Sequence, residues 1–350
     1  MNYPINEILL LLLVSIVISA ILSWATIRLA PHINLMDVPG SALHKIHQKP
    51  TPFTGGIVLI TSLTIISMVF LPEHIKSIQG ILIGAWIIFI FALLDDIYDL
   101  SPVVKLIGQI IAAVVLINLG IKINIFHSPE FIFHSNNLLD TWANNSLTIL
   151  WVLVLTNAFN FIDSTDGLAI GLGSLSIAFY LIATLGIMQV DLAYFCTILL
   201  GIAISLYFFN SNPAHLFLGD SGSQTLGFIL AGVAITYTPV AVNQMSSWFV
   251  PILIFGVPLF DISLVILSRI RRCKRIHSAA NDHVYHRLIK YGFLKNKAVS
   301  ILHISSLILS IIGFLCLNLD HYLANFIFMM FLIVGIYFLF ILDYRYVDIK

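Results

Sequence analysis

Eleven apolar stretches follow one another along this chain, and they constrain its fold more than any other feature. Most approach the roughly twenty residues that a helix needs to cross a bilayer. They cover residues 6–28, 55–71, 80–94, 105–120, 147–161, 168–187, 191–209, 223–240, 248–268, 298–318 and 322–342. Because 59% of the residues are apolar and only 10% are charged, the pattern excludes an ordinary soluble enzyme. The sequence predicts one all-α domain over residues 1–350, a polytopic membrane protein with about eleven transmembrane helices.

The positive-inside rule sets the expected orientation, since Lys and Arg accumulate in cytoplasmic loops. With the N-terminus outside, fifteen of the seventeen Lys and Arg fall on the inner side, and only Lys76 and Lys122 fall outside. We therefore expect the N-terminus out and the C-terminus in, with the protein in the cell (inner) membrane. Lys plus Arg balance Asp plus Glu, so the chain has no basic excess for binding nucleic acid. Most Asp side chains also fall inside, which predicts an active site that faces the cytoplasm.

The first polar cluster is the pair Asp95 and Asp96, where the third apolar stretch meets the inner side. Adjacent carboxylates repel each other, so they need a cation or a raised pKa. The functional interpretation is a base and metal-organising pair beside a phosphate-binding lysine, Lys105. The alternative is a solvated turn with a helix-capping Asp.

In the second cluster Asn157, Asn160, Asp163 and Asp166 recur every three residues. This spacing places them along one side of a helical or tight-turn segment. Four oxygen-bearing side chains beside a membrane are costly unless something binds them, which makes them candidates for substrate or metal contact. Hydrated turn chemistry is the alternative, because Asn and Asp favour turns.

The third cluster centres on Asp220, which lies between two glycines and two serines just before the eighth stretch. Glycines let backbone N–H groups approach a phosphate, and a helix N-terminus favours anions, while the Asp could instead hold a cation. A plain helix start is the alternative. Together with the other clusters, the motif favours a magnesium site, because Mg²⁺ takes one or two protein oxygens plus substrate phosphates.

A basic inner loop over residues 269–297 contains His283, His286 and Arg287. The two histidines would share one helical face. No third His or Cys stands at a zinc-like spacing, so contact with a phosphate or sugar is favoured over a zinc site. Attraction to anionic lipid and topological anchoring are the alternatives for the loop's other basic residues.

The first inner loop adds Lys45 and His47 ahead of a glycine pair, as candidate substrate contacts; positive-inside anchoring is again the alternative. Asp261 stands apart, because it lies about 12 Å into the ninth stretch at the rise of a helix. We expect it to pair with the loop that follows or to orient it.

These motifs, in this order from Asp37 to Leu288, resemble the polyprenyl-phosphate N-acetylhexosamine-1-phosphate transferase family. The NAFNFID form of the second cluster and the HxxHRL ending are similar to the GlcNAc-1-phosphate branch. The resemblance implies an enzyme that moves GlcNAc-1-phosphate from a UDP-sugar to polyprenyl (undecaprenyl) phosphate and releases UMP. That reaction is the first membrane step of cell-envelope polysaccharide synthesis.

The resemblance also implies roles for individual residues. Asp95 and Asp96 match the family's catalytic aspartate pair, and Lys105 matches its phosphate-contacting lysine. It implies Mg²⁺ contact, with Mn²⁺ as the alternative, by Asn160 and Asp220. Nucleotide recognition falls around Asp163 and Asp166, and donor-sugar or phosphate recognition falls to His283 and His286. The implied partners are a UDP-sugar, a polyprenyl phosphate lipid and the membrane, and a homodimer is left open.

The implied reaction brings two anions together, since the lipid phosphate attacks the β-phosphorus of the UDP-sugar. At an effective dielectric near 20, two unit charges at 4 Å repel by about 4 kcal/mol, so cations are required. Asp95 is the candidate to accept a proton from the lipid phosphate or to position it, and Asp96 to hold Lys105 or a metal-bound water. A two-step route through a phospho-aspartate stays open.

Two other functions fit some of the same features. A cation- or proton-coupled transporter also places acidic residues in a multi-span protein. Transporter sites favour the midplane, however, whereas these carboxylates lie at inner ends. A CDP-alcohol phosphotransferase also combines Asp residues with Mg²⁺, but its pattern has an Arg soon after the Asp-Gly, and the residues after Asp166 and Gly167 lack it.

Overall fold

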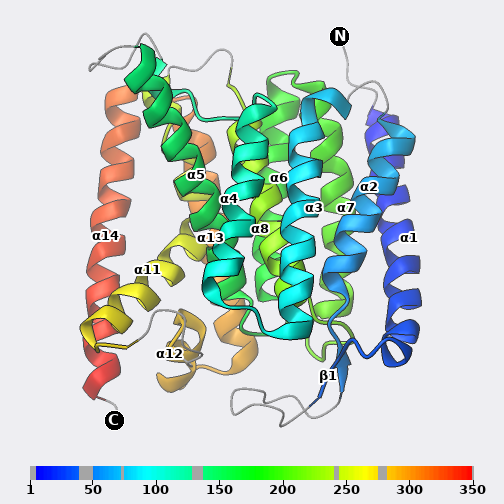
Figure 1. Cartoon of the computed structure of the whole chain (residues 1–350). Coiled ribbons are helices and arrows are strands. Elements are labelled where there is room, and N and C mark those ends of the chain that lie inside the picture. The colour runs from blue at the N-terminus through cyan, green and yellow to red at the C-terminus, as the bar shows by residue number, and fades with distance from the viewer. Residues whose placement is uncertain are drawn as a thin grey trace.

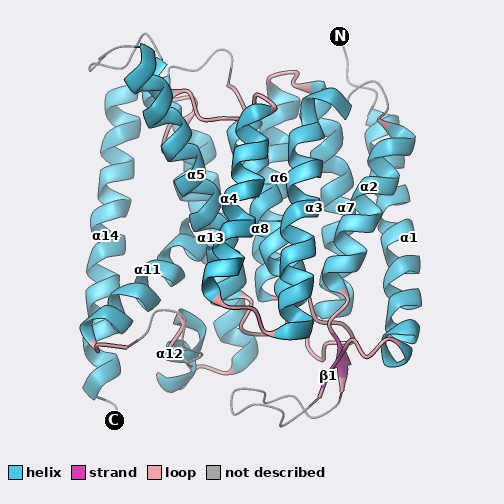
Figure 2. Cartoon of the chain, in the orientation of Figure 1, coloured by secondary structure: helices cyan, strands magenta, loops and turns pink. Residues whose placement is uncertain are grey.

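The computed structural model describes residues 5–38, 50–71, 75–127, 137–239, 244–274 and 282–348, and these fold into a helical bundle with one short two-stranded ribbon (Figure 2). The helices are α1 (Ile5–Leu29), α2 (Gly55–Phe70), α3 (Ile75–Tyr98), α4 (Pro102–Asn118), α5 (Asn137–Ile162), α6 (Leu168–Gly186), α7 (Val190–Asn210), α8 (Gly219–Thr236), α9 (Gln244–Ser247), α10 (Val250–Ile254), α11 (Gly256–Arg271), α12 (Val284–Lys290), α13 (Lys295–Cys316) and α14 (His321–Asp348). Two 3₁₀ turns, η1 (Ala30–His32) and η2 (Ile125–His127), and the strands β1 (Met36–Asp37) and β2 (Thr51–Pro52) complete the described chain. The all-α prediction is confirmed.

Each of the eleven apolar stretches is helical over most of its described residues, but the helices differ in length and composition. Seven of the described helices, α1, α3, α5, α6, α7, α13 and α14, are long and apolar enough to cross a membrane. The bent pair formed by residues 244–254 and α11 adds an eighth if it is one span. α2 and α4 are shorter apolar helices, and α8 begins with a polar turn. The number of eleven crossing helices therefore stays a prediction.

Helix α8 forms the centre of the bundle and is buried throughout residues 221–234 (Figure 1). Small residues let its neighbours approach closely, as in other membrane helix packings. A Cβ atom on Gly227 would lie only 2.7 Å from the backbone oxygen of Leu155 in α5. This packing places the N-terminal end of α8, with Asp220, beside the inner end of α3.

The ninth apolar stretch is not the single helix that the sequence predicts over residues 248–268. It breaks at Phe255, and the segments on either side meet at an angle of 67°. Pro251 and Pro258 flank the break, and proline lacks the N–H that a continuous helix uses. Beyond the break, α11 runs away from the central helices toward α14 at the edge of the bundle (Figure 1). The bend carries Asp261 and the basic end of α11 toward α12.

The first inner loop is attached to the segment that leads into α8. β1 and β2 pair antiparallel, and the backbone N–H of Phe217 donates to the Pro52 carbonyl at 2.8 Å. The N–H of Gly55 donates in turn to the Phe217 carbonyl at 3.0 Å. Lys45 and His47, both predicted to bind substrate, lie outside the described residues.

Candidate active site

Lys105 connects two carboxylates that are far apart in sequence. Its Nζ forms an ion pair with Asp95 and approaches Asp220 Oδ2 at 3.3 Å. Asp95 Oδ1 also accepts a hydrogen bond from the Leu100 backbone N–H at 2.8 Å, which fixes the turn between α3 and α4. The Asp95 side chain is 4% exposed, whereas those of Lys105 and Asp220 are 28% and 35% exposed. The lysine and Asp220 are therefore accessible to a ligand, while Asp95 lies behind them.

Asp96 holds the start of α8. Its two carboxylate oxygens accept hydrogen bonds from the backbone N–H groups of Asp220 at 2.9 Å and Ser221 at 3.0 Å. A carboxylate at this position satisfies free N–H groups and complements the positive end of the helix. The sequence-based hypothesis that Asp96 holds Lys105 is wrong, because Asp95 makes that contact. Adjacent residues of a helix point about 100° apart, so the two Asp side chains reach different neighbours.

A chain of amide side chains, of which those of Gln109 and Gln224 are buried, leads to Asp220. Gln109 and Asn157 exchange hydrogen bonds at 2.7 and 3.4 Å, and Gln109 also donates to Gln224 at 3.1 Å. Gln224 in turn donates to Asp220 Oδ2 at 3.4 Å. The sequence reasoning missed Gln109 and Gln224, although a polar amide inside an apolar stretch was the available signal. Asn157 was predicted to bind substrate. Its side chain is hydrogen-bonded to Gln109, so the contacts observed here orient the neighbouring amide side chains.

The second cluster reaches the same place from the end of α5. Asn160 donates to the Ser223 hydroxyl at 3.1 Å, one turn along α8 from Asp220. Asp163 follows in the turn between α5 and α6 and makes no hydrogen bond within the described part of the chain. Burial, with the charges of Asp220, Asp166 and Asp96, raises the pKa of Asp163 well above its ordinary value. The site thus holds more carboxyl groups than Lys105 alone can balance in their charged forms.

The turn that carries Asp166 rests on the segment before α8. Asp166 Oδ2 accepts a hydrogen bond from the Ala214 backbone N–H at 3.3 Å. Gly167 adopts a left-handed conformation, with φ of 73°, and its N–H donates to the Asn210 side chain at 3.0 Å. These contacts join the start of α6 to the loop that ends at Asp220.

The basic loop brings His283 against the second cluster. The His283 ring packs edge-on against Phe161 of α5, with ring centroids 6.2 Å apart. The ring centroid of His286 lies 6.1 Å from that of His283. Burial, with the charge of His283, lowers the pKa of His286 to about 4, so this imidazole is neutral at pH 7. Asp261 pairs with His283, as the sequence led us to expect.

Arg287, predicted to bind substrate, is instead built into the protein interior. Its guanidinium donates to the Asp282 carbonyl at 2.9 Å, the Ser268 hydroxyl at 2.8 Å and the Leu342 carbonyl at 2.7 Å. The residue is 1% exposed. These contacts give Arg287 a structural role, in which it fastens α12 to α11 and α14.

The Asp282 carboxylate is held by two arginines of α11. Arg269 binds it through Nε at 3.1 Å and through a terminal nitrogen at 2.9 Å, and Arg272 adds a contact at 3.0 Å. Burial alone would raise the pKa of Asp282, but Arg269, His283 and Arg272 more than offset burial and hold this pKa below its ordinary value.

The predicted magnesium ligands fit a divalent cation in their chemistry. Asp220 and Asn160 offer oxygen donors of the kind that Mg²⁺ takes. Burial and the neighbouring carboxylates raise the pKa of Asp163, and a cation bound among these carboxylates would offset their mutual repulsion. Among the described residues, no group of three or more His, Cys, Asp or Glu side chains could hold a metal ion by itself. A magnesium ion here would therefore need waters and substrate phosphates to complete its coordination.

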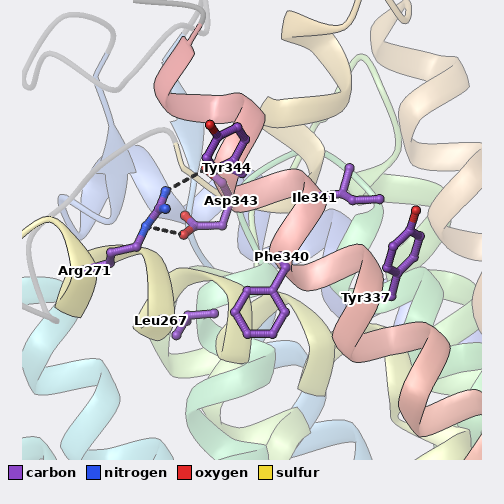
Figure 3. A pocket seen from close by; sticks show the side chains of 7 residues that line it. All are labelled: Leu267, Arg271, Tyr337, Phe340, Ile341, Asp343 and Tyr344. Carbon is purple, nitrogen blue, oxygen red and sulfur yellow. Dashed lines mark hydrogen bonds and ion pairs between the residues drawn. The ribbon is translucent and has the colours of Figure 1, made fainter.

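A pocket of about 370 Å³ lies elsewhere, between α11 and α14 (Figure 3). It is lined mainly by Leu267, Tyr337, Phe340 and Ile341, and the Arg271–Asp343 ion pair, at 2.7 Å, borders it. None of the clustered aspartates of α3 and α8 lines it, so this pocket is separate from the candidate active site.

Comparison with known proteins shows which family this chain resembles. The model described as glycosyl transferase family 4 matches residues 78–238, from α3 to the end of α8, which include the Asp pair, Lys105 and Asp220. Relatives also match well beyond that region. The chain is similar to glycosyl transferase family 4 over residues 78–238. The resemblance of its ordered motifs to this family is confirmed.

Three relatives of this chain show how far the similarity extends. A Bacillus subtilis protein named probable undecaprenyl-phosphate N-acetylglucosaminyl 1-phosphate transferase is 28% identical, over 90% of this chain and 88% of the relative. The decaprenyl-phosphate N-acetylglucosaminephosphotransferase of Mycobacterium tuberculosis is 27% identical, over 86% and 80%. A phospho-N-acetylmuramoyl-pentapeptide-transferase of Clostridium acetobutylicum is 28% identical, over 78% and 87%. The alignments thus cover most of this chain and of each relative.

Proposed function

We propose that this chain transfers GlcNAc-1-phosphate from UDP-GlcNAc to a polyprenyl phosphate, such as undecaprenyl phosphate, and releases UMP. The observation that carries the proposal is the position of Lys105, whose ammonium group lies between Asp95 and Asp220 at the start of α8. Relatives that align over most of the chain are named for transfer of N-acetylglucosaminyl phosphate to undecaprenyl or decaprenyl phosphate. The site combines the cation and the carboxylates that such a transfer needs.

We further propose that all eleven apolar segments cross the membrane, with the N-terminus outside and the site facing the cytoplasm. The distribution of Lys and Arg supports this orientation. An odd number of crossings agrees with α1 beginning at the end of the bundle opposite to that where α14 finishes (Figure 1). The soluble nucleotide and the lipid-embedded acceptor would then meet at the inner surface of the cell membrane.

Lys105 would bind the phosphates of the substrates. A phosphate that contacts its ammonium group competes with Asp95, which leaves the Asp95 carboxylate placed to accept the proton of the lipid phosphate or to position it. Asp96 would keep α8 in place, so that the Asp220 carboxylate stays directed at the site. His283 and His286 would contact the phosphate or the sugar of the donor from the side of α5.

We propose that Asn160 and Asp220 hold Mg²⁺, with Mn²⁺ as an alternative. Bound there, the ion would supply positive charge against the diphosphate of the donor. The chain contributes the two oxygen donors and the neighbouring carboxylates that favour a cation. Treatment with a chelator should abolish transfer, and added Mg²⁺ should restore it.

The transporter alternative has no observation in its favour. The carboxylates that it would use lie at helix ends, and the deeper one, Asp261, is paired with His283. The match of residues 78–238 to a transferase family points the same way.

The decisive experiment supplies membranes that contain the chain with polyprenyl phosphate and radiolabelled UDP-GlcNAc. We expect label in the organic extract and an equal amount of released UMP. Competition with unlabelled UDP-GalNAc and UDP-MurNAc-pentapeptide measures donor selectivity. Absence of extractable label with each of these donors would contradict the proposal.

A further inference from the structure

Asp261 is a buried carboxylate that the proposed chemistry does not use directly. It lies in the second turn of α11 and is 1% exposed. Its Oδ2 lies 2.8 Å from His283 Nδ1, and its Oδ1 accepts a hydrogen bond from the Val284 backbone N–H at 2.7 Å. Both carboxylate oxygens are therefore directed at the start of α12, the helix that carries the second histidine.

The contact with Asp261 determines which histidine nitrogen carries a proton. A carboxylate oxygen accepts hydrogen bonds, so His283 Nδ1 must be the donor. The proton on Nδ1 leaves Nε2 on the other side of the ring, where no residue in the described part of the chain forms a hydrogen bond with it. The His283 side chain is 12% exposed, so part of the ring is accessible from solution.

Among the described side chains, the ion pair of the Asp261 carboxylate is with His283. The nearby arginines of α11 are directed elsewhere, since Arg269 and Arg272 both bind Asp282. A buried carboxylate is expensive without a partner, so the Asp261–His283 pair is strongly favoured in the folded state. The edge-on contact with Phe161 of α5 then restricts the orientation of the His283 ring.

We propose that Asp261 is a positioning residue, which holds His283 with Nδ1–H on its own carboxylate and presents Nε2 to the phosphate or sugar of the UDP-sugar donor. This inference rests on the proposed transferase function. Carboxylates that orient a metal-binding histidine in this way typically contribute about 10–100-fold to metal affinity or activity, and we expect a similar factor for His283.

The test compares Asp261→Asn, His283→Ala and the double variant in the purified full-length chain, with UDP-GlcNAc and polyprenyl phosphate as substrates. Asp261→Asn should slow transfer roughly 10–100-fold. It should do so through the same kinetic parameter, kcat or KM, that His283→Ala changes. The double variant should be no slower than His283→Ala, because the carboxylate acts only through the histidine. Asp261→Glu keeps a carboxylate and should recover part of the activity.

Asp320→Asn is the matched control, because it makes the same change at the start of α14, where Asn caps a helix as well as Asp does. Thermal unfolding of each variant separates lost activity from lost fold. If Asp261→Asn does not accumulate as folded protein, Asp261→Glu enters the same comparison with His283→Ala.

Effects that multiply in the double variant would overturn the inference, as would an Asp261→Asn variant with normal kinetics. An active wild-type chain with either result would leave the proposed function standing. A wild-type chain that transfers no label from any UDP-sugar would contradict the proposed function, and this inference with it.

Discussion

The carboxylate of Asp96 accepts a hydrogen bond from the backbone N–H of Asp220 at 2.9 Å, across 124 residues of sequence. The inner end of α3 is thereby fastened to the first turn of α8. The same turn of α8 carries the carboxylate that approaches Lys105. One tertiary contact therefore sets the relative position of the Asp pair, the lysine and the proposed metal ligand.

Gly219→Ala should weaken this contact. Gly219 has φ of 70°, and a Cβ atom there would lie 2.9 Å from Asp96 Oδ2. A non-glycine residue in this conformation costs about 1–2 kcal/mol. Displacement of the carboxylates should slow transfer about tenfold or more. Thermal unfolding and the initial rate of transfer measure the two effects. Gly335→Ala in α14, where a Cβ meets nothing within 4 Å, should leave the rate of transfer unchanged and should not lower the unfolding temperature. Equal behaviour of the two variants would contradict the role of Gly219.

Lys105→Met should remove the cation that Asp95 and Asp220 share. With both substrates anionic, we expect transfer to fall by about a hundredfold or more, the loss typical when one electrostatic contact to the reacting groups is removed. Lys105→Arg keeps the charge and should retain more activity. Rates per amount of inserted protein provide the measurement, with Lys122→Met, between α4 and η2, as the control. A Lys105→Met variant as active as that control would rule out the proposed role.

Arg287→Lys distinguishes a structural role from a substrate contact. Lysine keeps the charge but cannot donate to Ser268, Asp282 and Leu342 together. We expect a stability loss of roughly 1.5–3 kcal/mol, measured by thermal unfolding, while the KM for UDP-GlcNAc in the folded fraction stays close to the wild-type value. A large rise in KM at unchanged stability would show instead that Arg287 binds the donor.

The pKa of Asp282 predicts a pH-dependent contribution to stability. Because this pKa lies below the unfolded value of about 4, the charged carboxylate stabilises the fold fully above that value. The contribution is lost as the pH falls through the folded-state pKa. Asp282→Asn should therefore unfold at a lower temperature than wild type at neutral pH, and the gap should narrow in acid. A gap that does not change between about pH 7 and pH 3 would contradict this account.

The helices could be predicted from the sequence because long apolar stretches have few alternatives in a membrane. The break at Phe255 was not predicted, although Pro251 and Pro258 mark it. Apolar composition continues through the break, so hydropathy alone cannot reveal a change of direction. The start of α5 at Asn137, ten residues before the predicted stretch, was missed because the first turns of that helix are polar.

The site was predicted in part. Spacing and residue type indicated that Asp95, Asn160 and Asp220 belong together, and the structure places them around the start of α8. The division of roles between Asp95 and Asp96 could not be predicted, because it depends on how α3 is rotated against its neighbours. The structural role of Arg287 depends on a carbonyl group of α14, 55 residues away, which no local pattern shows.

Asp220 lies where α8, the lysine of α4 and the chain of amide side chains meet, and the proposed transfer depends most on this residue. The most direct measurement is the initial rate at which Asp220→Asn transfers label from UDP-GlcNAc to polyprenyl phosphate, at saturating Mg²⁺ and normalised for inserted protein. We expect the transfer rate of Asp220→Asn to be lower by about a hundredfold or more than the rates of the wild type and of Asp320→Asn. A near-wild-type rate for Asp220→Asn would contradict the proposed role of Asp220.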